Sequence, residues 1–278
     1  MGALRYYSWA CAACLAMGTL AHAQTEYLVS TSGNDGNSGI GAGNELATLG
    51  EAVFRTNTDA NAGGTGAPYT IRVAAGDYLE NELVITTPVT IIGPMDGVDP
   101  RPTLGSTRVI TDTTNEAVVH TADSNIVDIQ TSDVVIRGMA FWGATSDAIE
   151  SDEPGGGATL TGIEFSYNIL TGNNSPAAFN GNDGMDMFSL ENGVISYNHI
   201  HNFGTTAIKL KGGTGTLVKN NEVHNIRLGS ATPSVGAIGL YQDSTGMAND
   251  ARIVGNLIYD VPSMPGISIG NDNTLTRQ

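Results

Sequence analysis

Two short segments of the chain place a charged residue between apolar ones in the same alternating pattern. They are residues 184–187 (GMDM) and 207–210 (AIKL). Successive side chains of a β-strand point to opposite faces, so the apolar residues predict an inner face, and Asp186 and Lys209 an outer one. A carboxylate can bind a cation and a lysine can accept a proton, which makes this pair a candidate for chemistry.

The same pattern recurs on either side of these segments, at residues 148–151, 237–240 and 266–269. Placed in register, the outer positions form one column: Glu150, Asp186, Lys209, Gly239 and Ser268. Neighbours in such a column of parallel strands lie about 4.8 Å apart. With Asp147 and Asp183 beside the column, the pattern predicts a cluster of carboxylates and a lysine on one outer face.

Short strands with a repeated turn must position this column. After residue 130 the chain repeats a unit of short apolar segments. One turn of each unit carries an Asn or Gly: Gly138, Asn168, Asn198, Asn221 and Asn256. We expect an all-β fold, a right-handed parallel β-helix, because Asn tolerates left-handed turns and stacked Asn side chains can form hydrogen-bonded ladders. An antiparallel sandwich is the competing fold, but it needs hairpin turns and does not explain the matched column.

The N-terminus has the features of a targeting segment. Arg5 precedes an apolar run at residues 9–20, and the Ala-His-Ala sequence that follows is typical of a cleavage site. This pattern predicts a signal peptide over residues 1–23 and a secreted or periplasmic protein. Cys11 and Cys14, the only cysteines, lie inside this segment, so the mature protein would form no disulfide.

The remaining residues, 24–278, are expected to form one β-helix domain. The capping-box pattern at residues 48–51 predicts a short helix, ending near Arg55, that covers the N-terminal end of the coil. Residues 76–78 predict a turn, and residues 108–110 a strand. Because no cap follows the strand at 266–269, either the sequence is a piece of a longer protein or another chain covers that edge.

The charge of the chain limits its partners. With 28 acidic and 12 basic residues, its net charge is −16. This charge disfavours nucleic acid and anionic membranes as partners. No segment after the signal peptide is long enough to span a membrane, and we expect a monomer. An acidic polysaccharide would be repelled unless a bound cation such as calcium reversed the local charge.

The chemistry-bearing residues resemble a known family. Residues 182–186 (NDGMD), followed by 207–210, resemble the site of polysaccharide lyase family 9, the calcium-dependent pectate lyases. In that family an acidic run holds calcium and a G-F-K-L-G-G run presents a lysine base. This chain departs from the pattern, since Asn182 replaces an Asp, Ala-Ile precedes Lys209 instead of Gly-Phe, and Lys211 interrupts the Gly-Gly pair.

This resemblance implies a polysaccharide lyase that cleaves a uronate-containing polymer, pectate-like or alginate-like, by calcium-assisted β-elimination. Lys209 would be the catalytic base. The expected calcium ligands are Asp147, Glu150, Asp183 and Asp186. Substrate-binding residues are expected at Lys211 and Tyr241, in the next outer column, and at Arg227, in an inserted loop.

Other functions stay open on the same scaffold. A non-catalytic surface or carbohydrate-binding protein would use Lys209 only in an ion pair with Asp186, and a glycosidase or epimerase would depend on carboxylates without calcium. The three histidines that follow the turn asparagines, His199, His201 and His224, are expected to be surface or ladder residues away from the Asp186–Lys209 face. Their spacing does not match a zinc motif.

Overall fold

The structure is a computed structural model that describes most of the chain. It describes residues 25–61, 68–121, 125–151, 159–172, 183–227, 236–243, 246–262 and 264–271. The predicted signal peptide, residues 1–23, and Asn182 lie outside the described residues.

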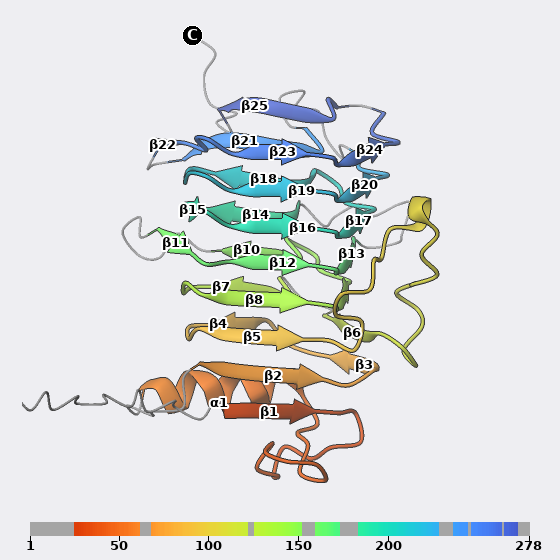
Figure 1. The fold of residues 1–278 in the computed structure, drawn as a ribbon, viewed down its shortest axis with the longest axis vertical. Coiled ribbons are helices and arrows are strands. Elements are labelled where there is room, and N and C mark those ends of the chain that lie inside the picture. Colours follow the sequence, from red (N-terminus) through yellow and green to blue (C-terminus); the bar gives the residue numbers. More distant parts are fainter. Residues whose placement is uncertain are drawn as a thin grey trace, which may run out of the picture.

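The described strands build a parallel β-helix with stacked coils, which we call rungs (Figure 1). The first sheet runs in the order β1 (Thr25–Val29), β2 (Tyr69–Val73), β5 (Val89–Ile92), β8 (Val134–Arg137), β12 (Glu164–Ser166), β16 (Val194–Ser196), β19 (Leu217–Lys219) and β23 (Arg252–Val254). The second contains β3 (Gly76–Leu79), β6 (Ala117–His120), β9 (Ala140–Trp142), β13 (Ile169–Thr171), β17 (His199–His201), β20 (Glu222–His224) and β24 (Leu257–Tyr259).

The third sheet carries the predicted column. It contains β4 (Leu83–Ile85), β7 (Val127–Ile129), β10 (Ile149–Ser151), β14 (Asp183–Phe188), β18 (Thr206–Lys211) and β21 (Ile238–Asp243), followed by β25 (Ile267–Asn271) and the short β22 (Gly246–Met247). Strands β11 (Leu160–Thr161) and β15 (Leu190–Glu191) form a separate small pair. Only β21 and β22 pair antiparallel among the described strands. The parallel pairing confirms the β-helix and excludes the sandwich.

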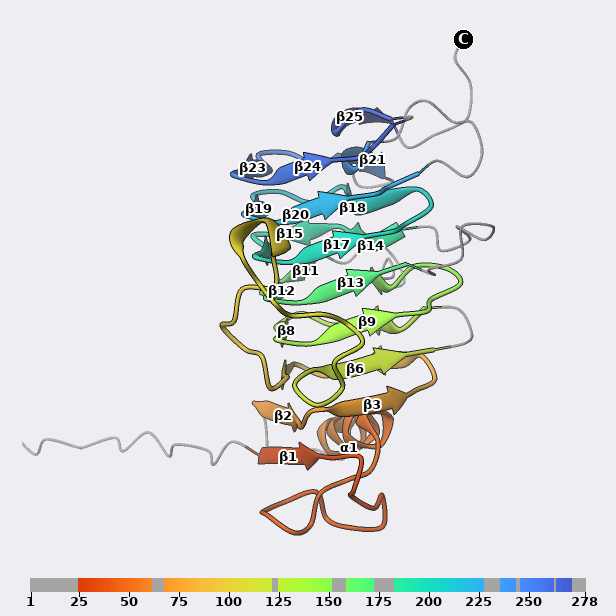
Figure 2. The ribbon, with the colours of Figure 1, turned by 90° about the vertical axis from the view of Figure 1, so that its right-hand side faces the viewer.

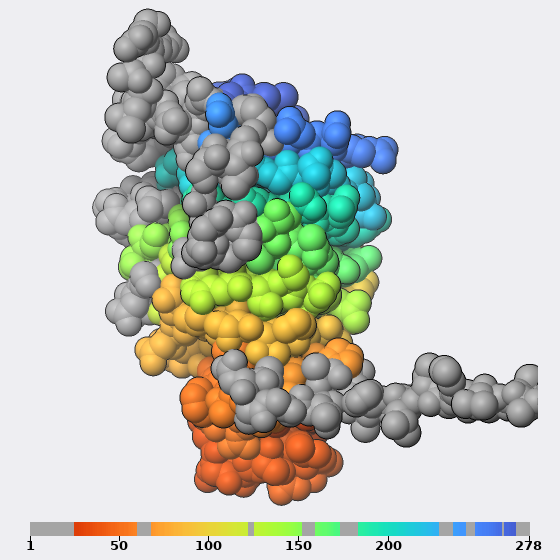
Figure 3. Space-filling model, turned by 90° about the vertical axis from the view of Figure 1, so that its left-hand side faces the viewer, coloured from red at the N-terminus to blue at the C-terminus, as the bar shows by residue number. Residues whose placement is uncertain are grey.

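Apolar side chains from all three sheets fill the interior of the coil. In the third sheet, Ile149, Met185, Ile208 and Ile238 occupy matching positions on successive rungs and are fully buried. Burying one such side chain contributes about 1.5–3 kcal/mol. The rungs appear as successive bands of colour along the molecule (Figure 3). The inner positions predicted from the alternation are therefore confirmed.

An asparagine ladder fixes the turn between the first and second sheets. Each asparagine side chain accepts a hydrogen bond from a backbone N–H of the preceding rung and donates one to a backbone carbonyl of that rung. The members of the ladder are Asn168, Asn198, Asn221 and Asn256. The ladder was expected, but its backbone conformation was not. The residue before each asparagine is the left-handed one, for example Tyr197 with φ 56°. Gly138 therefore aligns with Tyr167 and not with Asn168.

Helix α1 (Leu49–Asn61) lies at the N-terminal end of the coil, beside β1 (Figure 1). Its residues Leu49, Ala52 and Val53 are buried in the main core, which confirms the predicted capping helix, although the helix extends past Arg55. Thr48 Oγ1 accepts from the Glu51 N–H at 3.1 Å, and both carboxylate oxygens of Glu80 accept from the first helical N–H groups. These acceptors satisfy donors that have no partner inside the helix.

We expect Thr48→Ala to lower the free energy of unfolding by about 1 kcal/mol, because it leaves the Glu51 N–H without its acceptor. Thr48→Ser should retain most of the stability, since serine keeps the hydroxyl. Urea unfolding followed by circular dichroism measures both variants. Equal losses in the two variants would show that the cap is not what Thr48 contributes.

A long segment between β5 and β6, yellow in Figure 2, runs across the outer face of the second sheet. Its Ile110 packs against Val118, Ala140 and Ile169 of that sheet. Here the sequence-based expectations were wrong twice. Residues 108–110 form no strand, because Arg108 is buried in an ion pair with Glu116 at 2.7 Å. Residues 76–78 form no turn and belong to β3, because Gly76 pairs in register with Ala117.

Candidate functional site

The outer column of the third sheet has the register that the sequence predicts. Glu150 pairs with Asp186, Asp186 with Lys209, and Lys209 with Gly239. The pairing of Gly239 with Ser268 completes the predicted column. These side chains therefore lie on successive rungs of one face.

The column continues to one acid that the sequence reasoning missed. Asp128 of β7 pairs with Glu150 and is buried. Its neighbours Val127 and Ile129 are also buried, so the segment has the same apolar-acid-apolar pattern as residues 185–187. This alternation is the sequence signal from which Asp128 could have been predicted as part of the column. The acidic part of the column thus spans three rungs, from Asp128 through Glu150 to Asp186.

Three buried aspartates form the centre of the site. Oxygen atoms of Asp147, Asp183 and Asp186 lie within 4.8 Å of one another. The Asp183 N–H donates to Asp147 Oδ1 at 2.8 Å, which ties the two corners together. Among the described residues, no hydrogen-bond donor reaches Oδ1 of Asp183 or of Asp186, and both atoms are buried. Buried carboxylate oxygens of this kind are ligands for a hard cation.

Two lysines from β18 contact this centre. Lys209 Nζ donates to Asp183 Oδ2 at 3.3 Å and lies 3.4 Å from Asp186 Oδ2. Lys211 Nζ donates to Asp186 Oδ2 at 2.8 Å and lies 4.0 Å from the centre of the Phe188 ring. The side chain of Lys209 is 11% exposed. The charge of the aspartates is therefore partly balanced by ammonium groups at their outer edge.

Burial changes the protonation of two of the acids. It raises the pKa of Asp147 to about 6, against a backbone hydrogen bond from Asp183 that lowers it. Burial also raises the pKa of Asp183 to about 7, although the nearby Lys209 ammonium opposes the shift. At neutral pH, Asp183 therefore exchanges between a carboxylic acid and a carboxylate, and a cation would favour the carboxylate.

We expect the stability of an Asp183→Asn variant, relative to wild type, to increase as pH rises from 5 to 8. The folded-state pKa of Asp183 is raised above the unfolded value, near 3.9. Between these values the folded protein binds more protons, so its free energy of unfolding falls with rising pH. Asparagine mimics the protonated acid and removes this dependence. Urea unfolding in chelator at both pH values measures it, and a difference independent of pH would contradict the assignment.

Glu150 occupies its predicted position but is outside the group of three aspartates. Its Oε2 accepts a hydrogen bond from Asn125 Nδ2. Asn125 also accepts from the Asp147 N–H at 3.1 Å, so it joins Glu150 to the corner of the cluster. A role of Glu150 as a calcium ligand remains a prediction.

A family comparison agrees with this architecture. Residues 124–277, more than half of the chain, match the model of the right-handed beta helix region. The chain belongs to the right-handed β-helix family. A search of curated proteins found no match. The matched part of this β-helix protein includes all of the predicted site residues.

The predicted sugar-binding residues lie in different surroundings. Tyr241 of β21 pairs with Lys211 as expected, but its ring is buried against Gly239, and its hydroxyl contacts Ser268 Oγ at 2.7 Å. Contact with a sugar would require this ring to move. Arg227 lies after β20, where it lines a cavity of about 510 Å³ together with Asp260 and Pro262. That cavity shares no lining residue with the aspartate cluster.

The residues of the cluster fit a calcium ion. Asp147, Asp183 and Asp186 supply three carboxylates within one coordination sphere, and the buried Oδ1 atoms of Asp183 and Asp186 point to a missing partner. The ammonium group of Lys209 contacts two of these carboxylates and would compete with calcium for them.

No helix among the described residues is long and apolar enough to cross a membrane.

A second cluster was missed by the sequence reasoning. His199, His201 and His224 have ring nitrogens within 4.8 Å of one another on the second sheet. Their position away from the Asp186–Lys209 face is as expected. The signal for their proximity was the repeated Ile-His-Asn and Val-His-Asn sequence, which places His201 and His224 at equivalent positions of consecutive rungs.

Proposed function

We propose that this β-helix protein is a polysaccharide lyase that cleaves a uronate-containing polymer by β-elimination. The observation that carries the proposal is the buried group Asp147, Asp183 and Asp186 with Lys209 on the adjacent rung. A lyase of this kind needs a cation to neutralise the sugar carboxylate and a base within reach of the neighbouring ring proton. The cluster has the residue types for both.

The residues would divide the work as follows. Asp147, Asp183 and Asp186 would hold calcium, with Glu150 as the fourth expected ligand on the adjacent strand. When bound, calcium would neutralise the uronate carboxylate and acidify the proton on the carbon that carries it. Lys209 would take that proton, a ring double bond would form as the bond to the leaving sugar oxygen breaks, and that oxygen would take a proton from water. Lys211, at the edge of the cluster, would orient the anionic polymer.

Lys209 must be neutral to act as the base, and its present contacts favour the charged form. Asp183 and Asp186 both contact its ammonium group. A cation on these carboxylates takes over their charge, so the ammonium loses its partners and gives up its proton more readily. The same contacts are also compatible with a purely structural role, in which Lys209 only forms ion pairs with Asp183 and Asp186.

The setting of the reaction is part of the proposal. An acidic polysaccharide would be the partner, and the protein would act as a secreted or periplasmic monomer, without nucleic acid. The net charge of −16 disfavours a polyanionic substrate, and a cation at the site would reverse the local charge.

A glycosidase is the second candidate, and the protonation of the acids favours it. The raised pKa values of Asp147 and Asp183 are typical of a carboxyl group that donates a proton to a leaving group. In that reaction Lys209 would only position Asp183, and calcium would not be required.

Mass spectrometry of the products distinguishes the two reactions. Mature protein is incubated with polygalacturonate and, separately, with alginate in the presence of calcium. Elimination yields new ends that are lighter by one water than hydrolysis products. Unsaturated ends from either polymer would support the lyase, hydrated ends would establish the glycosidase, and uncleaved polymer bound to the folded protein would establish a carbohydrate-binding module.

A further inference from the structure

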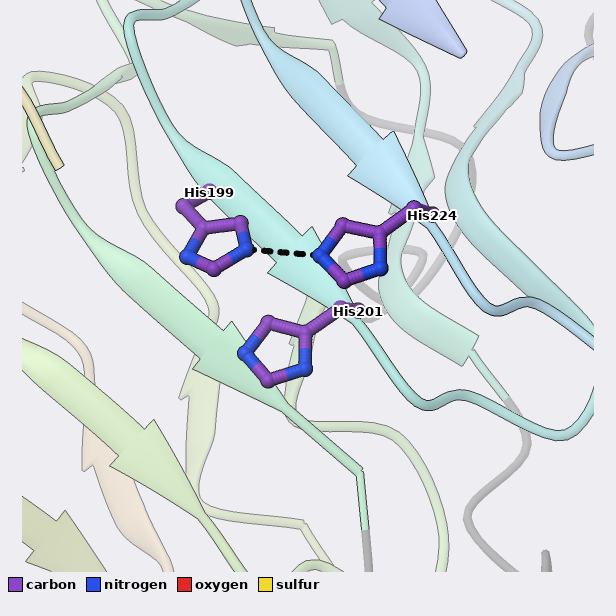
Figure 4. Close-up of side chains that lie close together, drawn as sticks. All are labelled: His199, His201 and His224. Carbon is purple, nitrogen blue, oxygen red and sulfur yellow. Dashed lines mark hydrogen bonds between the residues drawn. The ribbon is translucent and has the colours of Figure 1, made fainter. Parts of the chain in front are cut away.

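Three histidines gather on the outer face of the second sheet, whereas the aspartate cluster belongs to the third. His199 and His201 lie on β17, and His224 lies on β20, in register with His201 (Figure 4). His199 Nε2 and His224 Nε2 are 2.9 Å apart. The rings are stacked, with centroids 4.3 Å apart for His199 and His201 and 5.1 Å apart for His201 and His224.

The nitrogen atoms of this cluster have few other partners. His199 Nδ1 is buried and has no hydrogen-bond partner among the described residues. His201 Nδ1 lies 3.4 Å from Thr171 Oγ1, and the His201 ring also forms a hydrogen bond with the Asn202 side chain. His199 and His224 use one nitrogen each on one another. The three imidazole rings therefore lie close together, and at least one of their ring nitrogens, His199 Nδ1, forms no hydrogen bond with the described residues.

The imidazoles are held in their neutral form. Burial lowers the pKa of His199 to about 2 and that of His201 to about 4, and it also lowers the pKa of His224. A neutral imidazole carries a nitrogen lone pair at neutral pH, which is the form that binds a metal.

A buried carboxylate adjoins the cluster and favours a cation there. Glu222 pairs with His199 in the strand register and is fully buried. Its oxygen atoms accept from Thr103 Oγ1 at 2.5 Å and from Tyr259 Oη at 2.9 Å. These donors are neutral, and the carboxyl group of Glu222 also attracts positive charge on Arg101, His201 and His224.

We propose that His199, His201 and His224 bind a divalent transition metal ion of the zinc class. Imidazole nitrogen is a preferred ligand of such ions, with bonds of about 2.0–2.1 Å and ligand nitrogens about 3.4 Å apart in a tetrahedral shell. The ring nitrogens lie within 4.8 Å of one another, and His199 Nε2 and His224 Nε2 are 2.9 Å apart, so side-chain adjustments would bring them to this spacing. Three protein ligands leave a fourth position for water, and the ion would join β17 to β20.

Ring stacking alone is the competing explanation for the cluster. His224 also stacks on Tyr259, with centroids 4.7 Å apart, so this face carries a ladder of rings. Phenylalanine preserves stacking but has no ligand nitrogen. His201→Phe and His224→Phe therefore separate the two explanations. His120→Phe is the matched control, because His120 stacks on Trp142 of the same sheet, outside the cluster.

The test is calorimetric titration of untagged, chelator-treated protein with zinc, repeated with cobalt followed by visible absorbance. We expect one site per chain, the intense bands of tetrahedral cobalt, and at least a tenfold loss of affinity in His201→Phe and in His224→Phe. His120→Phe and Asp186→Asn should bind as wild type does. Melting in chelator checks that each variant folds. Absence of binding in wild type, or unchanged affinity in folded His201→Phe, would overturn the proposal.

Discussion

Lys209→Arg is expected to reduce the rate of the proposed β-elimination by roughly 10²–10⁴-fold while the protein remains folded. Arginine keeps a positive charge beside Asp183 and Asp186, which Lys209 contacts at 3.3 and 3.4 Å. The guanidinium group does not lose its proton in proteins, so it cannot act as a base. The variant therefore removes the chemistry and retains the ion pair. Initial rates on the cleaved polymer, together with a melting curve, measure both properties.

Lys219→Arg is the matched control for this prediction. Lys219 lies on β19 of the first sheet, outside the aspartate cluster, and we expect its variant to react as wild type does. If Lys209→Arg retained full activity, Lys209 would be only the partner of the aspartates. The base would then have to be another group.

Asn198→Ala is expected to lower the free energy of unfolding by about 3–5 kcal/mol. Asn198 Oδ1 accepts from the Asn168 N–H, and its Nδ2 donates to the Phe165 carbonyl, both at 3.0 Å. The substitution leaves these two buried backbone groups without partners, and each costs about 1–3 kcal/mol. It also leaves a space inside a close-packed turn. Urea unfolding followed by circular dichroism measures the loss.

Asn44→Ala is the control for the ladder, because Asn44 is exposed in a loop near the N-terminus. Its effect should stay within about 0.5 kcal/mol. A loss of less than about 1 kcal/mol in Asn198→Ala would mean that water replaces the ladder, and that the asparagines are not a main support of the turn.

The sequence was sufficient for the register of the site because strand periodicity and the rung repeat both constrain it. A shift of one residue would turn Met185 and Met187 outward, so burial of the apolar residues fixes the position of Asp186. The same reasoning predicts Lys209 one rung later. It also applies to Asp128, which was missed only because the repeat was recognised after residue 130.

Features that depend on side-chain direction or on distant loops could not be predicted in this way. The ring of Tyr241 occupies the space that a side chain at position 239 would take, and because residue 239 is glycine, the ring packs there and is buried. Arg108 forms an ion pair with Glu116 instead of continuing a strand. The histidine cluster requires the alignment of β17 with β20; the repeated Ile-His-Asn and Val-His-Asn sequences signal this alignment, whereas a search for zinc-motif spacing along the chain does not find it.

The most direct test of the proposed lyase is the ultraviolet absorbance of unsaturated product. Mature protein is mixed with polygalacturonate or alginate, each with calcium and with chelator, and Asp186→Asn serves as the ligand variant. The proposal predicts absorbance that rises on one polymer with calcium, and that stays flat with chelator or in the folded variant. A flat trace with calcium on both polymers, from folded wild-type protein, would contradict it.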